Sequence, residues 1–308
     1  MLRALAYERD PAGAARSLAL FRILLGCAVL WQALATARDL PLLVGEFGLI
    51  QRNLNDALAA DVLPRIRWFV PAHASGWASE KHIIYFLFAL YLISVFYLIV
   101  GYRTKWFAAA SLFFHLLFNS SGSASSYGAH ALSTSGLFFC LVLPVGCFYA
   151  VRGGKRPVVP DTIGISRFGL RAYMTLVYAS SGMEKLSGGP WRNGDAMWNF
   201  LMRPEVSLMN FGWISHVPFV AAGLAWIVLA VETGYILCLI MTRIRPVWFF
   251  LTLLLHLGIA LTIHLWFFSL TMIALNVGAL AALRGSPRVQ AGRLVHFGPR
   301  PVASRNAN

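Results

Sequence analysis

The segment YASSGMEKLSGGPWRNGDAMW, residues 178–198, places an acid and an amine side by side at the end of an apolar stretch. That stretch runs from Leu170 to Gly182, so Glu184 and Lys185 fall where a membrane span would leave the hydrocarbon. Charged side chains at such a depth are costly, which makes both residues candidates for a functional site. A lysine partly stripped of water is a usable base at neutral pH, whereas a carboxylate beside it favours the protonated amine. The sequence leaves both outcomes open.

A plain structural role for this segment also remains open. Lysines at helix ends commonly extend to the membrane surface, and tryptophans gather there as an aromatic belt. Lys185 with Trp191 and Trp198 fits that pattern.

The composition of the whole chain identifies it as a membrane protein. Hydrophobic residues make up 58% of the 308 residues, charged residues only 12%, and the mean hydropathy is +0.65. Such values exclude a soluble globule. We therefore expect an all-α fold: a polytopic bundle of transmembrane helices with interfacial helices on its outer face. The cysteines lie in apolar stretches without the paired spacing of metal ligands, which predicts small core residues at Cys27, Cys140, Cys147 and Cys238.

The distribution of apolar residues predicts three regions. Residues 1–16 form a basic N-terminal leader, residues 17–283 the transmembrane domain, and residues 284–308 a basic tail that we expect to be disordered. No small-residue cleavage pattern follows the first apolar run, so we expect a retained span there. The eight expected spans cover about 17–36, 82–100, 106–118 with an irregular polar extension over 119–130, 131–150, 170–182, 217–241, and two short helices within 246–283 hinged near 263–266.

The segments between the spans have their own patterns. Mixed polar and apolar residues at helical spacing predict interfacial helices over 40–69 and 191–213. Residues 102–105 are few enough to predict a tight turn, and residues 151–171 read as a basic connection.

The basic residues predict the orientation in the membrane. With a cytoplasmic N-terminus, seventeen Lys and Arg side chains fall on the cytoplasmic side and eight on the other, as the positive-inside rule requires. We therefore attribute the net charge of +14 to topology and expect no nucleic-acid partner. The prediction is a multi-pass protein of the cell inner membrane with both termini in the cytoplasm and Lys185 in the outer half of the bilayer.

Two charged residues fall inside predicted spans. Arg22 lies about one turn inside the first span, where it either extends to the headgroups or pairs with an intramembrane acid. Glu232 lies near the middle of the span over 217–241, where it is either protonated and hydrogen-bonded to a neighbouring helix or ionised and paired. We predict that Arg22 or Lys185 offsets the charge of Glu232.

The segment over 178–198 resembles a known family. It is similar to the part of vitamin K-dependent γ-carboxylases that carries their catalytic lysine, and to the bacterial HTTM proteins, which share that membrane domain. The positions that carry the resemblance are Tyr178, Gly182, Lys185-Leu186, Trp191 and Gly194. The resemblance implies that Lys185 deprotonates a vitamin K-type hydroquinone. This starts an oxygen-dependent epoxidation whose strong base removes a glutamate γ-proton.

The resemblance extends to polar positions elsewhere in the chain. Asn119 and Tyr127-Gly128 match the outline of a polar segment that contributes to the reaction chamber in these families. His130 stands where HTTM-like sequences usually carry an acid, and it is our candidate replacement for that group. Glu232-Thr-Gly234 matches an acid found at this place in HTTM-like proteins, and the run that begins His256-Leu-Gly258 resembles their late spans.

Two functions from different classes follow. The first is an integral membrane enzyme that uses a vitamin K-type quinol, or acts on another lipophilic small molecule. Its expected catalytic residues are Lys185, Glu184, His130 and Asn119, and its expected substrate-binding residues are Tyr127, Tyr178, Trp191, Trp198, Glu232 and His256. The second is a non-catalytic accessory membrane protein for the maturation or export of a secreted peptide, like HTTM-type proteins of bacterial peptide-toxin systems. The lipid bilayer is a partner in both.

Two further activities are less favoured by the sequence. Animal carboxylases carry a large extramembrane domain after their spans, and here about 25 residues follow position 283, so we do not expect carboxylation of a propeptide-bearing protein. A metal site built from His115, His256 and His264 is a minor alternative, because histidines between membrane helices more often act as hydrogen-bonding groups. We predict no metal.

Overall fold

The computed structural model describes residue 8 and residues 10–46, 48–70, 77–151, 159–203 and 210–283. Within these ranges the chain forms helices and no strands, which confirms the all-α prediction. The α-helices are α2 (Pro11–Thr36), α3 (Leu40–Val44), α4 (Arg52–Leu58), α5 (Trp77–Val100), α6 (Thr104–Ser121), α7 (Gly128–Val142), α8 (Pro160–Ser187), α9 (Gly189–Asn193), α10 (Asp195–Leu201), α11 (Phe219–Gly234), α12 (Leu237–Ile240), α13 (Arg245–Ile263) and α14 (Trp266–Leu280). The disordered tail expected over 284–308 lies outside the described residues.

Helices occupy the positions of the predicted spans. Three helical stretches are long and apolar enough to cross a membrane: Pro11–Thr36, Glu80–Val100 and Thr242–Ile263. The helices α7, α11 and α14 are also apolar but shorter. The predicted hinge near 263–266 is confirmed, because α13 ends at Ile263, His264 adopts a left-handed backbone with φ of 57°, and α14 begins at Trp266.

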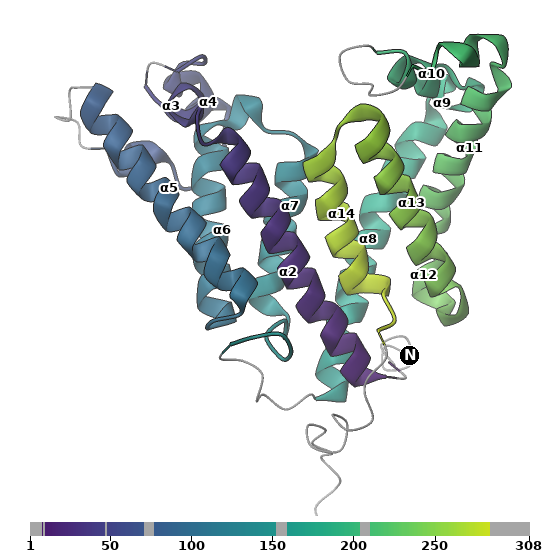
Figure 1. The fold of residues 1–308 in the computed structure, drawn as a ribbon, viewed down its shortest axis with the longest axis horizontal. Helices are drawn as coiled ribbons and strands as arrows, with labels where there is room; N and C mark the ends of the chain where they lie inside the picture. Colours follow the sequence, from purple (N-terminus) through teal and green to yellow (C-terminus); the bar gives the residue numbers. More distant parts are fainter. Residues whose placement is uncertain are drawn as a thin grey trace, which may run out of the picture.

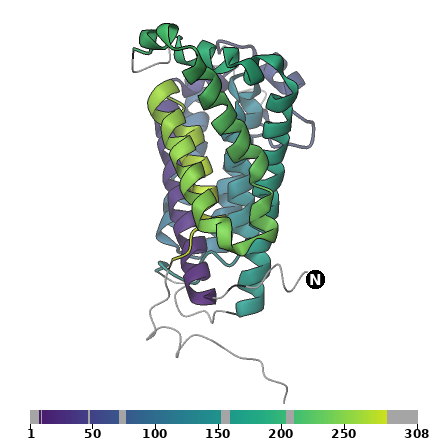
Figure 2. The same cartoon turned by 90° about the vertical axis from the view of Figure 1, so that its right-hand side faces the viewer.

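The helix α14 lies in the middle of the bundle (Figure 1), where it packs against α2, α7, α8 and α13. On one side of it α2, α5, α6 and α7 pack together, and on the other α11 packs against α8. Figure 1 shows the short helices α3, α4, α9 and α10 at one end of the bundle and the start of α2 at the opposite end. Seen from the side, the long helices run along one common direction (Figure 2). Both predicted interfacial regions therefore form short helices at the same end.

Small residues allow α2 and α14 to approach closely. Ala15 and Ala19 of α2 and Ala274 of α14 are fully buried. A Cβ atom added at Gly278 would lie 3.0 Å from the Cβ atom of Phe21 and 2.7 Å from a methyl group of Leu170. Membrane helices generally associate through such small residues, because their backbones can then make dense van der Waals contact.

Replacing Gly278 with valine should therefore destabilise the bundle by about 1–3 kcal/mol, because the added atoms overpack a tight contact. Thermal unfolding of the detergent-solubilised protein measures the loss. The matched control is Gly258→Val in α13, where an added Cβ atom meets nothing within 4 Å. Equal melting temperatures for the two variants would show that the α2 to α14 contact does not limit stability.

Several helix boundaries differ from the sequence-based expectation. The first is that of α2, which begins at Pro11 inside the predicted leader over 1–16. The irregular stretch expected over 119–130 is shorter, because α6 continues to Ser121 and α7 already begins at Gly128. The fourth helix was expected to reach residue 150, but α7 ends at Val142. Pro144 explains this end, since proline has no N–H and holds the preceding residue, Leu143, in extended backbone with ψ of 158°.

The prediction of a basic connection over 151–171 is wrong from Pro160 onward. Pro160 opens α8 at the first helical position, where its missing N–H costs nothing. Arg167 and Arg171 are consequently side chains of a bundle helix, and both are buried. Both donate hydrogen bonds to backbone carbonyls at the end of α14, which makes their burial possible.

Arg22 is fully buried, and neither predicted alternative holds for it. Its guanidinium donates to the carbonyl oxygens of Ile99 at 3.3 Å, of Val145 at 3.4 Å, and of Tyr149. Gly101 adopts a positive φ of 82°, and a Cβ atom there would lie 2.6 Å from Nη1 of Arg22. Arg22 thus ties α2 to the end of α5 and to the segment after α7 by satisfying backbone carbonyls.

The four cysteines are free thiols. Cys140, Cys147 and Cys238 are buried, as predicted. The prediction is wrong for Cys27, which is exposed on the surface of α2.

Candidate functional site

An amine and a carboxylate meet where α8 ends. Lys185 Nζ donates to both carboxylate oxygens of Glu232 in α11, each at 2.6 Å, and to Oγ of Ser181 at 2.6 Å. The Glu232 side chain is 9% exposed and that of Lys185 21%, so the pair is largely removed from water. The prediction that Glu232 is offset by Arg22 or Lys185 is confirmed, and the partner is Lys185.

Gly182 brings the two helices close enough for this pair. A Cβ atom at Gly182 would lie 2.9 Å from a methyl group of Thr233 and 3.2 Å from the Cβ atom of Glu232. Ser181 lies four residues before Lys185 and hence on the same face of α8. Its hydroxyl oxygen accepts a hydrogen bond from the Lys185 ammonium and helps to hold it in place. The sequence motif thus contains both the charged group and the small residue that admits its partner.

Glu184 does not take part in this arrangement. It is exposed, whereas Lys185 is half-buried. Consecutive helical residues point in directions about 100° apart, so an acid next to a lysine in sequence does not face the same neighbour. The structure therefore places this expected catalytic residue outside the Lys185 to Glu232 contact.

Deeper in the bundle, Tyr178 and His256 form a buried polar group, and the sequence analysis did not identify its other members, Tyr235 and Asn276. The Tyr178 hydroxyl and Nε2 of His256 share a hydrogen bond of 2.8 Å. Nδ2 of Asn276 donates to the Tyr178 hydroxyl at 2.8 Å, and the Tyr235 hydroxyl donates to Oδ1 of Asn276 at 3.1 Å. The rings of Tyr178 and Tyr235 stack at 4.5 Å.

The directions of these hydrogen bonds assign the histidine tautomer. The Tyr178 oxygen accepts from Asn276 and has room for a second donor, but its own proton would then lack an acceptor among the described residues. We therefore assign that proton to the hydrogen bond with Nε2 of His256. His256 then carries its proton on Nδ1. That atom is buried and has no hydrogen-bond partner among the described residues. A buried donor without a partner is rare, and it marks a position where a ligand group can bind.

The other predicted site residues gather in a second polar group between α6 and α7. Nδ2 of Asn119 lies 3.0 Å from Nε2 of His115, whose Nδ1 lies 2.7 Å from the Tyr91 hydroxyl. His130 belongs to the same group, because its carbonyl oxygen lies 3.3 Å from Nε2 of His115. Its ring accepts from the backbone N–H of Tyr127 at 3.3 Å and so also caps the start of α7.

One aromatic residue of α14, Phe268, touches the surroundings of both groups. Its ring centroid lies 5.6 Å from that of His256. A Cβ atom added at Gly128 would lie 3.9 Å from the same ring. The Tyr127-Gly128 step and His256 therefore approach one another across α14, with an apolar ring between them.

The two predicted tryptophans have different surroundings. The Trp191 ring centroid lies 5.2 Å from Nζ of Lys185, a cation–π distance. Trp198 packs instead against a small cluster built from Leu201, Ile214 and Ala221. Only Trp191 belongs to the immediate environment of the ion pair.

Polar side chains follow one face of α8 along most of its length. Arg167, Arg171, Tyr178 and Lys185 are spaced by four, seven and seven residues, which keeps them on one side of a helix. Arg167 and Lys185 are 18 positions apart, which corresponds to a rise of about 27 Å, close to the thickness of the hydrocarbon core. Each of the four side chains contacts α14 or a helix between α11 and α14.

The histidines considered as metal ligands are not gathered. His115 and His256 belong to the two separate polar groups, and His264 lies at the hinge between α13 and α14. In the part of the chain that the structure describes, no three His, Cys, Asp or Glu side chains come together as a metal site would require.

Comparison of the chain with protein-family models, with curated proteins and with solved structures gives no match.

Proposed function

We propose that this protein is an integral membrane enzyme that removes a proton from a quinol or another lipophilic hydroxyl compound. The proposal includes eight spans, both termini in the cytoplasm of the inner membrane, and likeness to the membrane domain of vitamin K-dependent γ-carboxylases. The observation that carries it is the pair of Lys185 and Glu232, an amine and a carboxylate at 2.6 Å in largely dry surroundings at a helix end. Charged groups that are costly to bury concentrate at functional sites.

The pair works as one unit in this proposal. A carboxylate in contact holds the proton on the amine, so Lys185 is an ammonium at rest. Burial weakens the preference for two charges over two neutral groups, which allows the proton to pass from Nζ to a Glu232 oxygen along their hydrogen bond. The free amine then takes the substrate hydroxyl proton. The substrate becomes an oxyanion beside the restored ammonium, and Glu232 holds the extra proton.

The neighbouring side chains suit a flat aromatic substrate. The Trp191 ring lies against the ammonium and can stack on an aromatic ring. His256 supplies a proton on Nδ1 that no described residue accepts, and a quinol oxygen is an acceptor for it. We propose that the substrate oxygen nearer the membrane centre binds at His256 while the other faces Lys185.

The test uses the purified protein in phosphatidylcholine nanodiscs with a reduced naphthoquinone and oxygen. We expect the hydroquinone absorbance to decay faster than in protein-free nanodiscs, with an epoxide as product detected by mass spectrometry. Equal decay with and without protein would contradict the enzymatic proposal and favour the accessory role.

The proposed topology predicts which residues can be labelled from outside. In a chain with Cys27 replaced by alanine, single cysteines at Lys155 and Arg203 should behave oppositely towards a membrane-impermeant maleimide. Arg203→Cys should react in intact spheroplasts, whereas Lys155→Cys should react only after lysis, because the positive-inside rule places the segment around it in the cytoplasm. Reaction of Lys155→Cys from outside would refute the orientation.

A further inference from the structure

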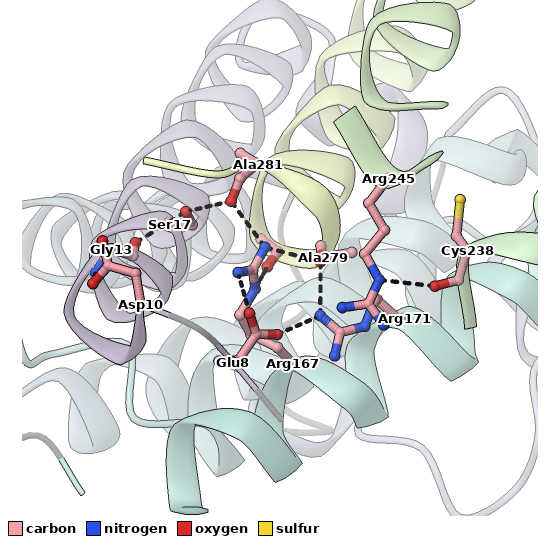
Figure 3. A network of polar contacts seen from close by, with 11 residues as sticks. Glu8, Asp10, Gly13, Ser17, Arg167, Arg171, Cys238, Arg245, Ala279 and Ala281 are labelled. Atoms are coloured by element: carbon pink, nitrogen blue, oxygen red, sulfur yellow. Dashed lines mark hydrogen bonds and ion pairs between the residues drawn. The ribbon is translucent and has the colours of Figure 1, made fainter. Parts of the chain in front are cut away.

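Three buried arginines gather at the end of the bundle where α2 begins (Figure 3). Arg167 and Arg171 lie one turn apart in α8, and Arg245 is the first residue of α13. They are 4%, 0% and 8% exposed. Arg245 is close enough to Arg171 for their charges to repel, and Figure 3 shows the two guanidinium groups next to each other. Such a cluster is costly unless acceptors surround it.

Backbone carbonyls satisfy part of the cluster. Arg167 donates to the carbonyl oxygens of Gly278, Ala279 and Ala281 at 3.1, 3.0 and 2.9 Å. Arg245 Nε donates to the Cys238 carbonyl at 2.9 Å. These oxygens lie in the last turns of α14 and α12 or just beyond, where carbonyls lack intrahelical partners and the helix dipole favours a cation. Capping of the ends of α14 and α12 therefore explains why Arg167 and the Nε side of the Arg245 guanidinium are buried.

The negative charge in contact with the cluster is smaller than its positive charge. Glu8 pairs with Arg167 at 3.2 Å and with Arg171 at 2.6 Å. The nearby carboxylate of Asp10 accepts from the backbone N–H of Gly13 and so caps α2. Outside the described ranges the sequence contains one further Asp or Glu, Glu205, which lies 34 residues after Arg171 in the sequence. In the described structure one carboxylate, that of Glu8, thus contacts two of the three guanidinium groups, and Arg245 has no ion pair with an acid among the described residues.

Several donors of the cluster have no partner. Nε and Nη2 of Arg171 and Nη2 of Arg245 are buried and make no hydrogen bond within the described residues. The Arg171 side chain is only 1% exposed. An unpaired donor on a buried charged group carries its full desolvation cost, so these N–H groups indicate a missing anionic acceptor.

We propose that Arg171 and Arg245, with Arg167 beside them, form a binding site for a phosphate group. A phosphate presents several acceptor oxygens in different directions, which fits free N–H groups on two guanidiniums, and arginine matches phosphate geometry bidentately. The anion enters beside Arg245, whose neighbours Arg243 and Pro246 are exposed. The site lies at the end of the long helices, which the proposed topology places at the level of the lipid headgroups. An anionic phospholipid of that leaflet is therefore the favoured source of the phosphate, and free phosphate is the other.

The test compares phospholipids retained by the purified full-length protein in native mass spectrometry. We expect phosphatidylglycerol to be retained in preference to phosphatidylcholine. Arg245→Gln should weaken that retention by about ten-fold, the effect of losing one charge-assisted hydrogen bond. The matched control is Arg243→Gln, which removes the same charge from an exposed side chain two residues away and should leave retention within about two-fold.

The outcomes separate the ligand sources and the competing explanation. Displacement of phosphatidylglycerol by inorganic phosphate would assign the site to the small anion, and retention despite phosphate would assign it to the lipid headgroup. Equal losses in Arg245→Gln and Arg243→Gln would overturn the proposal, because general surface charge would then explain the preference. Glu8→Gln, which removes the competing carboxylate while preserving side-chain size, should strengthen retention, and a weaker retention in that variant would also count against the site.

Discussion

Replacing Lys185 with arginine should lower hydroquinone turnover by at least about 100-fold, the usual contribution of a general base. Arginine keeps the positive charge and can pair with Glu232, so the contact between α8 and α11 survives. A guanidinium does not release its proton at working pH, however, and therefore cannot accept one from the substrate. The rate of hydroquinone loss in nanodiscs, measured at equal amounts of folded protein, reports the effect.

The control for this variant is Arg192→Lys, an exposed cation in the same helix as Trp191. This variant changes a nearby exposed basic group and leaves Lys185 and Glu232 unaltered. Its rate of hydroquinone loss should therefore match that of the unaltered protein. A Lys185→Arg rate within a few-fold of the unaltered protein would show that Lys185 serves only as a structural partner of Glu232.

Replacing Arg22 with methionine should destabilise the protein by about 3 kcal/mol, because buried backbone carbonyls lose their hydrogen-bond donor. Methionine retains the length and apolar packing of the side chain but leaves three carbonyls, those of Ile99, Val145 and Tyr149, without their donor. Each unsatisfied buried carbonyl carries a desolvation cost of about 1–3 kcal/mol.

Thermal unfolding in detergent measures this loss. Arg38→Met is the matched control, because Arg38 is exposed just after α2 and its replacement removes the same charge from the same part of the chain. A melting temperature for Arg22→Met equal to that of the control would mean that water or rearranged backbone satisfies the carbonyls.

Most of the helical architecture could be predicted from hydropathy, because most bundle helices carry enough apolar residues to be recognised alone; α8 could be recognised only from Leu170 onward. Helix ends were harder, since they depend on single residues such as Pro144 and Pro160. The pairing of Lys185 with Glu232 was among the predicted options, but the adjacent Glu184 was also counted as catalytic. Adjacency in sequence was misleading there, because neighbouring helical residues face different directions.

The polar partners inside the bundle could not be predicted from one sequence. Tyr235 and Asn276 are single polar residues in apolar stretches, and only the fold shows that both reach Tyr178. Arg167 and Arg171 looked like surface residues of a basic connection, because the acceptors that bury them are carbonyls more than 100 residues away in sequence. Backbone acceptors have no sequence signature, since every residue carries one.

The polar face of α8 has a consequence for how this protein is made. During synthesis α8 leaves the ribosome before α11, α13 and α14, which later supply the partners of Lys185, Tyr178 and Arg167. An arginine or lysine deep in a helix opposes insertion by the translocon by roughly 2.5–3.5 kcal/mol. In the proposed eight-span topology α8 is therefore a weak stop-transfer segment on its own, and we expect its stable insertion to follow the synthesis of α13 and α14.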